Sequence, residues 1–199
     1  DVERSRGLGD VYKRQALERT YVYRICDASD YCDYDPRMRG FVLKLDDVLD
    51  VDAMNQAARL MIGLHDFGSF ARPNPGGTTI RDVKSVCWER VGTRANDVRV
   101  KLKTGCVPPV EQGLLEFTIV ADAFAHNMVR SLVQACVQIG CGKRSFDWFE
   151  EKINVPLREG STGPIDPHGL TLEYVAYPPD EELASRAEKI RARRDSAEL

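Results

Sequence analysis

One long segment with helical periodicity constrains the fold of this chain more than any other feature. In residues 123–149, "AFAHNMVRSLVQACVQIGCGKRSFDWF", the apolar side chains recur at helical spacing and fall on one side, at Ala125, Met128, Val129, Leu132, Val133, Cys136 and Ile139. Gly140 and Gly142 are expected to end this helix. A helix with such an apolar side has to be buried against a second layer of structure, which predicts a layered globular domain.

The second layer is predicted to be a β-sheet. Residues 19–25 alternate as a half-buried strand, and further strand-like stretches occupy residues 39–45, 80–91, 98–102, 114–120 and 170–178. A helix is predicted from residue 51, with Asp50 as its N-cap and Gly63 at its end, and Ser145 can cap a short third helix. Strands that follow one another, with two main helices among them, predict an α+β fold with a largely antiparallel sheet.

The distribution of charge is more informative than its sum. The net charge of −3 argues mildly against a polyanionic partner. From residue 123 to residue 146, however, the chain contains no Asp or Glu, and its basic side chains there are His126, Arg130, Lys143 and Arg144. A local basic face on an acidic protein is therefore predicted.

The cysteine pattern and the hydropathy exclude several classes. The six cysteines match no zinc-binding spacing, so reduced, structural thiols and no metal site are expected. No stretch approaches the ~20 apolar residues that span a membrane, so no membrane partner is predicted. A cytoplasmic setting is the default expectation. The "HDF" at residues 65–67 suggests an HD-type phosphohydrolase, but such a metal site needs further supporting histidines and carboxylates.

Arg130 is the residue whose partner the sequence does not reveal. It projects from the flank of the apolar stripe, close to Asn127 at i−3 and Gln134 at i+4. It either points into a cleft or lies over the core as an ordinary surface arginine. Tyr21 is equally open, since a strand tyrosine usually packs half-buried with its hydroxyl in water.

Four separated stretches resemble the C-terminal part of TruA-type tRNA pseudouridine synthases. They are "RTYVYRI" (19–25), "GLHDFGSF" (63–70), "AFAHNMVRSLVQACVQIGCGKRSFDWF" (123–149) and "GPIDPHGLTLEYVAYP" (163–178), and their order and spacing agree with the family throughout. The resemblance implies the pseudouridine synthase fold, with helices packed on one face of the sheet. It also implies isomerisation of uridine to pseudouridine in the anticodon stem-loop of tRNA, without metal or cofactor, by a homodimer with a basic cleft.

The resemblance assigns roles to individual residues. Arg130 would orient the nucleophilic aspartate, and Tyr21 would stack on the target base and take part in proton transfer. Arg19, His126, Lys143 and Arg144 would contact the RNA. The family's aspartate lies in a "GRTDxGVxA" segment of a preceding N-terminal domain, and nothing in this sequence matches that segment. The partner of Arg130 would then be this absent aspartate, and the chain alone is expected to be inactive.

The chain is accordingly divided into three parts. Residues 1–15 are interpreted as a non-native or disordered lead, residues 16–178 as the C-terminal domain of a synthase, and residues 179–199 as a charged tail that is helical or disordered. Three interpretations stay open at this point: a fragment of a pseudouridine synthase, a non-catalytic tRNA-binding or dimerisation domain, and an HD-type hydrolase.

Overall fold

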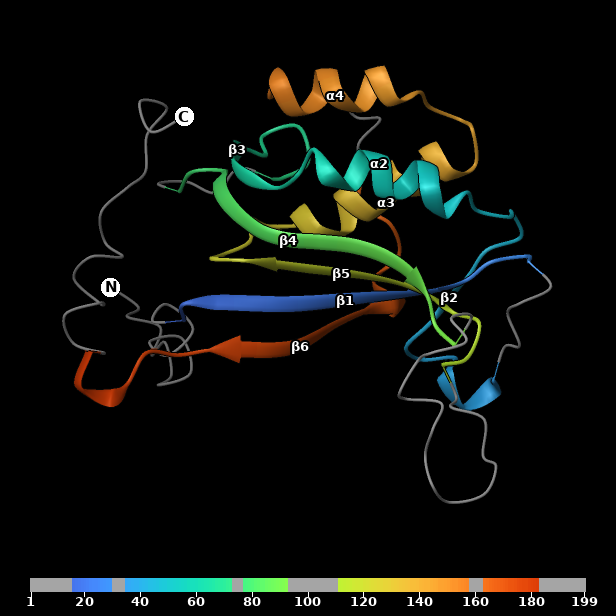
Figure 1. Cartoon of the computed structure of the whole chain (residues 1–199), viewed down its shortest axis with the longest axis horizontal. Coiled ribbons are helices and arrows are strands. Elements are labelled where there is room, and N and C mark those ends of the chain that lie inside the picture. Colours follow the sequence, from blue (N-terminus) through green and yellow to red (C-terminus); the bar gives the residue numbers. More distant parts are fainter. Residues whose placement is uncertain (1–15, 30–34, 73–76, 93–110, 158–162, 183–199) are drawn as a thin grey trace, which may run out of the picture.

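The structure is an α+β domain built on one six-stranded sheet. It is a computed structural model that describes residues 16–29, 35–72, 77–92, 111–157 and 163–182. The long strands are β1 (Glu18–Cys26), β4 (Ile80–Arg90), β5 (Leu115–Ala121) and β6 (Leu170–Ala176), and the short ones are β2 (Leu43–Lys44) and β3 (Gly63–Asp66) (Figure 1). The predicted α+β class with a largely antiparallel sheet is confirmed.

Strand β1 has neighbours along both of its edges. One edge of β1 pairs antiparallel with β5, which continues through β4 to β3. Its other edge pairs antiparallel with β6 along residues 18–23 and parallel with β2 at residues 25 and 26. The sequence-distant strands β1 and β6 therefore lie side by side, which brings residues 166–170 next to β1.

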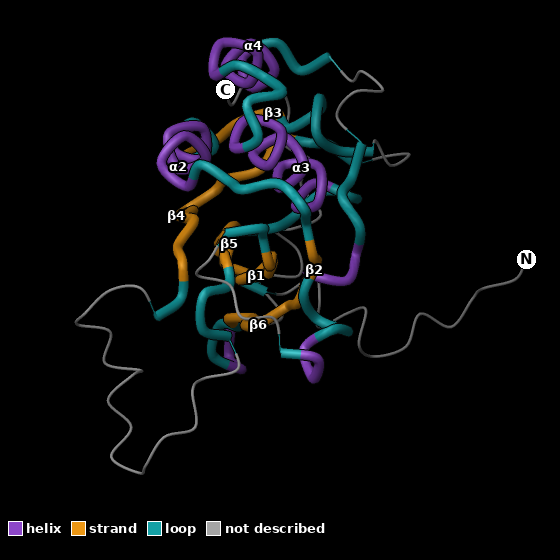
Figure 2. Tube along the Cα trace, turned by 90° about the vertical axis from the view of Figure 1, so that its right-hand side faces the viewer, coloured by secondary structure: helices purple, strands orange, loops and turns teal. Residues whose placement is uncertain are grey.

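Three helices cover one face of this sheet, as the resemblance implied. They are α2 (Val51–Arg59), α3 (Met128–Gly140) and α4 (Phe146–Asn154), and the view in Figure 2 shows all three on the same side. The core lies between the helices and the sheet, where Tyr23, Ile25 and Phe117 from the strands share one buried cluster with Leu132 and Cys136 of α3. Burial of these side chains explains why β1 alternates in sequence and α3 carries an apolar stripe.

The helix starts follow the predicted caps. Asp50 accepts a hydrogen bond from the Ala53 amide, and Ser145 accepts one from the Trp148 amide. The predicted end of the first helix was too late: α2 ends at Arg59, and Gly63 begins β3 in a left-handed conformation with φ 107°.

Two further predictions differ from the structure. The strand predicted for residues 39–45 is reduced to β2, because a 3-10 turn at Pro36–Met38 precedes it and only two residues pair with β1. Cys26 is disulfide-bonded, which corrects the expectation of reduced thiols at that position. Two other 3-10 turns occupy Pro167–Gly169 and Asp180–Glu182.

Several predictions concern residues outside the described ranges. These are the lead at residues 1–15, the strand at 98–102 and most of the tail beyond residue 182. Among the residues that are described, no helix is long and apolar enough to cross a membrane.

Candidate active site

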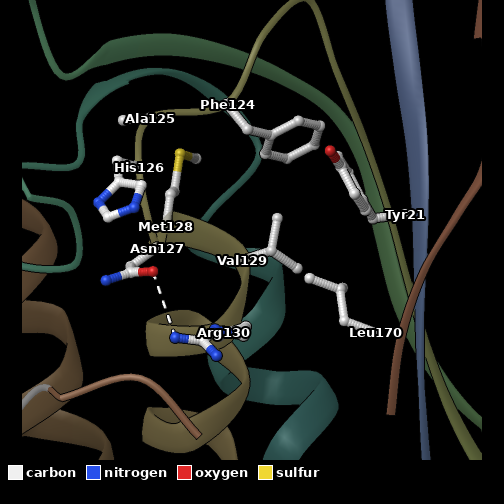
Figure 3. Close-up of a pocket in the computed structure, with 9 residues that line it drawn as sticks. All are labelled: Tyr21, Phe124, Ala125, His126, Asn127, Met128, Val129, Arg130 and Leu170. Carbon is white, nitrogen blue, oxygen red and sulfur yellow. Dashed lines mark hydrogen bonds between the residues drawn. The ribbon is translucent and has the colours of Figure 1, made fainter. Parts of the chain in front are cut away.

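A pocket of about 250 Å³ opens where α3 begins. Tyr21 reaches it from β1 and Leu170 from the start of β6, whereas its other lining residues come from the segment that leads from β5 into α3 (Figure 3). Those residues are Phe124, Ala125, His126, Asn127, Met128, Val129 and Arg130. The pocket thus joins the first strand, the last strand and the long helix, which are remote from one another in sequence.

Tyr21 forms an aromatic wall of the pocket. Strand alternation places Tyr21 on the same face of β1 as Tyr23, toward the helices. The rings of Tyr21 and Phe124 pack edge to face, with their centroids 5.1 Å apart, and Figure 3 shows the Tyr21 hydroxyl beside the Phe124 ring. A half-buried aromatic platform of this kind can stack on a planar ligand and still offer a hydroxyl group to it.

Arg130 places its positive charge at the same pocket. It is the third residue of α3, and its Nη2 donates a hydrogen bond to Oδ1 of Asn127 at 3.2 Å. Within the described ranges, no carboxylate forms an ion pair with Arg130. Among the described residues, the side-chain partner of Arg130 is therefore the neutral amide of Asn127.

The segment that precedes β6 forms hydrogen bonds with the backbone of Arg130 and with the side chain of Tyr23. The Ile165 amide donates to the Arg130 carbonyl at 3.2 Å. The hydroxyl of Tyr23, which is fully buried, donates to the Asp166 carbonyl at 2.5 Å. Burial raises the pKa of Tyr23 well above its usual value, the charge of Asp166 adds to this, and Arg130 opposes it. Tyr23 therefore remains a neutral donor.

The Asp166 carboxyl is held in its ionised form close to Arg130. The pKa of Asp166 lies below the usual value, chiefly because its carboxylate accepts a hydrogen bond from the His168 amide at 2.9 Å and contacts the His168 ring. The positive charge of Arg130 lowers this pKa further. Sequence reasoning did not single out Tyr23 or Asp166 as parts of the site. The available signal was local only: Asp166 precedes a Pro-x-Gly turn that it can cap.

His126 and Arg19 lie at different distances from the pocket. His126 is exposed and lines the pocket, and its carbonyl accepts a hydrogen bond from the Arg72 amide at 2.9 Å, which ties the loop after β3 to the start of α3. Arg19 pairs with Ala121 of β5, two residues before Tyr21 on β1, and is not among the pocket-lining residues.

Lys143 and Arg144 follow the opposite end of α3, about 15–20 Å of helix away from Arg130. The Lys143 Nζ forms an ion pair with Asp47 at 2.8 Å, and the Arg144 guanidinium lies 5.1 Å from the ring centroid of Trp148. The structure therefore does not bring these two cations to the pocket. Their contact with RNA stays a prediction.

The side chains of His65 and Asp66 in the "HDF" segment make local hydrogen bonds around the turn after β3. The Asp66 carboxylate accepts hydrogen bonds from the Gly68 amide at 3.0 Å and from the Thr79 hydroxyl, and the His65 ring contacts the Ile62 carbonyl at 3.0 Å. Both side chains are thus engaged in shaping the loop after β3, which gives them a structural role.

The pocket offers an aromatic wall and one guanidinium group whose charge is not neutralised within the described part of the chain. A guanidinium in such a place can hold a carboxylate or a phosphate by two parallel hydrogen bonds. The chemistry that fits is recognition of a planar base next to an anionic group.

Comparisons with known proteins agree with this chemistry. A family model described as tRNA pseudouridine synthase matches residues 57–178. The tRNA pseudouridine synthase A of Bifidobacterium animalis subsp. lactis is 63% identical over 179 residues, which cover 90% of this chain and 59% of that protein. The enzyme of the same name from Bifidobacterium longum strain DJO10A is 58% identical over 179 residues, covering 89% of this chain and 58% of the relative.

A more distant relative extends the comparison. The tRNA pseudouridine synthase A of Streptomyces griseus is 41% identical over 176 residues, covering 88% of this chain and 55% of that protein. The chain thus spans between 55% and 59% of the length of these three relatives. On the family match and these identities, the chain belongs to the tRNA pseudouridine synthase family of the TruA type.

Proposed function

We propose that this chain contributes Tyr21 and Arg130 to the active site of an enzyme that converts uridine into pseudouridine in the anticodon stem-loop of tRNA. The observation that carries the proposal is half-buried Arg130, which lines a pocket with an aromatic wall and whose guanidinium, among the residues that the structure describes, is bonded by the Asn127 amide and by no carboxylate. The relatives' names support the reaction class, and the aromatic wall beside a guanidinium supports this pocket as its site.

The reaction exchanges one glycosidic bond for another. The bond between C1′ of the ribose and N1 of the uracil breaks, the base turns, and C1′ bonds to C5. The C5 proton is then removed and N1 takes up a proton, so the product is an isomer of the substrate. An aspartate nucleophile has to stay ionised in a pocket from which water is excluded. A guanidinium beside it lowers its pKa and fixes its direction through two hydrogen bonds. We assign this role to Arg130.

Tyr21 is proposed to receive the target base. A base that is flipped out of the RNA needs an apolar or aromatic surface to replace its stacking. The edge-to-face packing on Phe124 holds the Tyr21 ring in place for this purpose. Its hydroxyl lies on the pocket side and is proposed to take part in removal of the C5 proton.

The nucleophile is proposed to come from a segment that this sequence does not contain, because no stretch matches "GRTDxGVxA". The 199-residue chain alone is then inactive. The proposal further includes a homodimer, and phosphate contacts by Arg19, His126, Lys143 and Arg144. The alternative, a non-catalytic tRNA-binding or dimerisation domain, predicts tRNA binding without turnover in every context.

The test joins residues 16–199 to the N-terminal part of the Bifidobacterium animalis relative, to give a fusion enzyme. Tritium release from tRNA labelled at C5 of uridine should be absent for the chain alone and present for the fusion enzyme. Mapping of the product should place pseudouridine in the anticodon stem-loop. A fusion enzyme that is folded and binds tRNA but releases no tritium would favour the non-catalytic alternative.

Arg130→Met in the fusion enzyme tests the assigned role. Removing one partner of a buried ion pair costs roughly 3–5 kcal/mol, which corresponds to a loss of about 10²- to 10³-fold or more in the single-turnover rate. Affinity for tRNA should change little, because it depends on phosphate contacts spread over the surface. Arg59→Met, at the exposed end of α2, is the matched control. A loss explained wholly by weaker binding would remove Arg130 from the chemistry.

A further inference from the structure

Asn127 has the most unusual backbone in the described part of the chain. It is the only residue there other than glycine with a positive φ, at φ 64° and ψ 0°. This left-handed conformation is unfavourable for most L-residues and is tolerated best by Gly, Asn and Asp. Its place is also unusual, because Asn127 is the N-cap of α3, where an extended conformation is the norm.

The N-caps of the other two described α-helices make the hydrogen bond that Asn127 lacks. Asp50 and Ser145 are extended, with φ of −79° and −87°, and each side chain accepts a hydrogen bond from an amide of the first helical turn. The Asn127 side chain makes no such bond. Asparagine is among the best residues for capping a helix, so the absence of the bond at Asn127 is unexpected.

The amide of Asn127 is directed to the Arg130 side chain instead. Its Oδ1 accepts a hydrogen bond from Nη2 of Arg130, as the dashed line in Figure 3 shows. In an ordinary cap, the same oxygen would bond a backbone amide of the first turn, to which Arg130 itself belongs. The left-handed backbone therefore exchanges a bond to the helix for a bond to the guanidinium group.

A neutral acceptor has a particular effect on an arginine. It fixes the direction of one N–H group and leaves the positive charge and the remaining donors available. An Asp or Glu at the same place would also fix the group but would neutralise it. The backbone of Arg130 is held separately, by the Ile165 amide at 3.2 Å, so both ends of the residue are held by hydrogen bonds with uncharged groups.

We propose that Asn127 is a positioning residue, which holds the Arg130 guanidinium toward the pocket while leaving its charge available for a carboxylate. The inference rests on the proposed function, because it gives Arg130 a carboxylate to bind. Asn127 itself need not touch the reacting atoms.

Three variants of the fusion enzyme test this role. Asn127→Gly keeps the left-handed backbone and removes only the amide. Asn127→Asp keeps an acceptor oxygen and adds a negative charge. Gln134→Ala removes an amide about two turns further along α3, outside the pocket-lining set, and serves as the matched control. Far-UV circular dichroism and urea unfolding confirm that each variant is folded.

The expected result separates chemistry from binding. Asn127→Gly should lower the single-turnover rate by about 10- to 100-fold, the effect of losing one hydrogen bond to a charged group. Asn127→Asp should lose at least as much, because its carboxylate occupies the guanidinium. The dissociation constant for tRNA should stay within about twofold for both, since phosphate contacts carry the affinity. A purely structural role predicts near-normal rates for both variants, and that result would overturn the inference.

A second measurement on the 199-residue chain needs no turnover. Nuclear magnetic resonance of the Arg130 guanidinium reports its rotation about the Nε–Cζ bond. We expect hindered rotation in the wild-type chain and in Asn127→Asp, and faster rotation in Asn127→Gly. Equal rotation rates in wild type and Asn127→Gly would show that the amide does not hold the group, even if the fusion enzyme proved inactive. An inactive wild-type fusion with hindered rotation would instead count against the proposed function alone.

Discussion

The ion pair between Asp27 and Arg90 allows a quantitative prediction about the stability of the fold. The Asp27 side chain is 0% exposed and that of Arg90 is 11% exposed. The guanidinium holds both carboxylate oxygens, at 2.9 and 2.8 Å. Asp27 also accepts hydrogen bonds from the Leu49 amide at 3.2 Å and from the Ser29 hydroxyl at 2.7 Å. The ion pair thus connects the end of β1 to the end of β4, and the bond from Leu49 connects both to the loop before α2.

The predicted perturbation is Asp27→Asn. It removes the negative charge of Asp27 and turns an amide NH₂ group toward the Arg90 guanidinium. Breaking a buried pair by removing one partner costs roughly 3–5 kcal/mol. For a domain of this size, each kcal/mol lowers the melting temperature by about 2–4 °C, so a decrease of about 6–20 °C is expected. This is a large part of the ~5–15 kcal/mol that stabilises a typical domain.

Urea unfolding followed by circular dichroism measures the effect. Asp47→Asn is the matched control, because Asp47 also pairs with a cation at 2.8 Å but both partners are more than half exposed. It should leave the free energy of unfolding unchanged within error. The double variant Asp27→Leu with Arg90→Met should recover much of the loss, because no charge is left unpaired.

The pH dependence provides an independent check. Burial opposes ionisation of Asp27, but the hydrogen bonds from Arg90, Ser29 and Leu49 outweigh it, so the pKa of Asp27 lies below its usual value. A lowered folded-state pKa stabilises the protein above the unfolded value of about 3.9, and this contribution is lost as the pH falls through the folded value. The stability difference between wild type and Asp27→Asn should therefore narrow below about pH 4. A difference below about 1 kcal/mol at pH 7, or no recovery in the double variant, would refute the reasoning.

Further predictions concern packing and RNA binding. Gly169→Ala should destabilise the fold by about 1–3 kcal/mol, because its Cβ would lie 2.6 Å from a backbone oxygen of β1. Gly140→Ala should cost less, since its Cβ meets the movable Met54 side chain and alanine favours the helix; urea unfolding ranks the two. Lys143→Glu with Arg144→Glu should weaken tRNA binding and make its salt dependence shallower. Filter binding across salt concentrations tests this, and an unchanged slope would return both residues to the solvated surface.

Much of the fold could be predicted from the sequence because its signals are local. The Asp50 and Ser145 caps, the alternation of β1 and the apolar stripe of α3 each depend on residues within a few positions of one another. The predicted strand at residues 39–45 was too long, because a local alternating pattern does not reveal which residues pair with a neighbouring strand. Residues 39–45 look like a strand, yet only two of them reach β1.

The candidate site was predictable only in part. Tyr21 and Arg130 came from the family resemblance, and the structure brings both to one pocket. The hydrogen bond from Tyr23 to Asp166 joins residues 143 positions apart and depends on β6 lying beside β1. No periodicity reports such a contact. The left-handed backbone of Asn127 is equally invisible in the sequence, where an asparagine before a helix predicts an ordinary cap.

The charges along residues 123–146 also differ from the charges that surround these residues in the folded structure. Residues 123–146 contain no acid, which predicted a basic face around Lys143 and Arg144. In the structure, Asp47 from the loop before α2 lies 2.8 Å from the Lys143 ammonium group. An acid-free stretch therefore does not give an acid-free surface, because neighbouring elements bring their own side chains.

A comparison of the arginines within the chain gives the strongest physical support for the proposed role of Arg130. Arg24 is matched by Glu111, Glu116 and Glu173, and Arg90 by Asp27. In each case the fold supplies a carboxylate where a guanidinium is largely removed from water, as the cost of burying an unpaired charge requires. Arg130 differs from these two arginines, since its partner among the described residues is an amide that cannot neutralise it. Arg130, unlike Arg24 and Arg90, is therefore able to accept a carboxylate from elsewhere, and the aspartate of a joined segment is the group that the proposed reaction needs there.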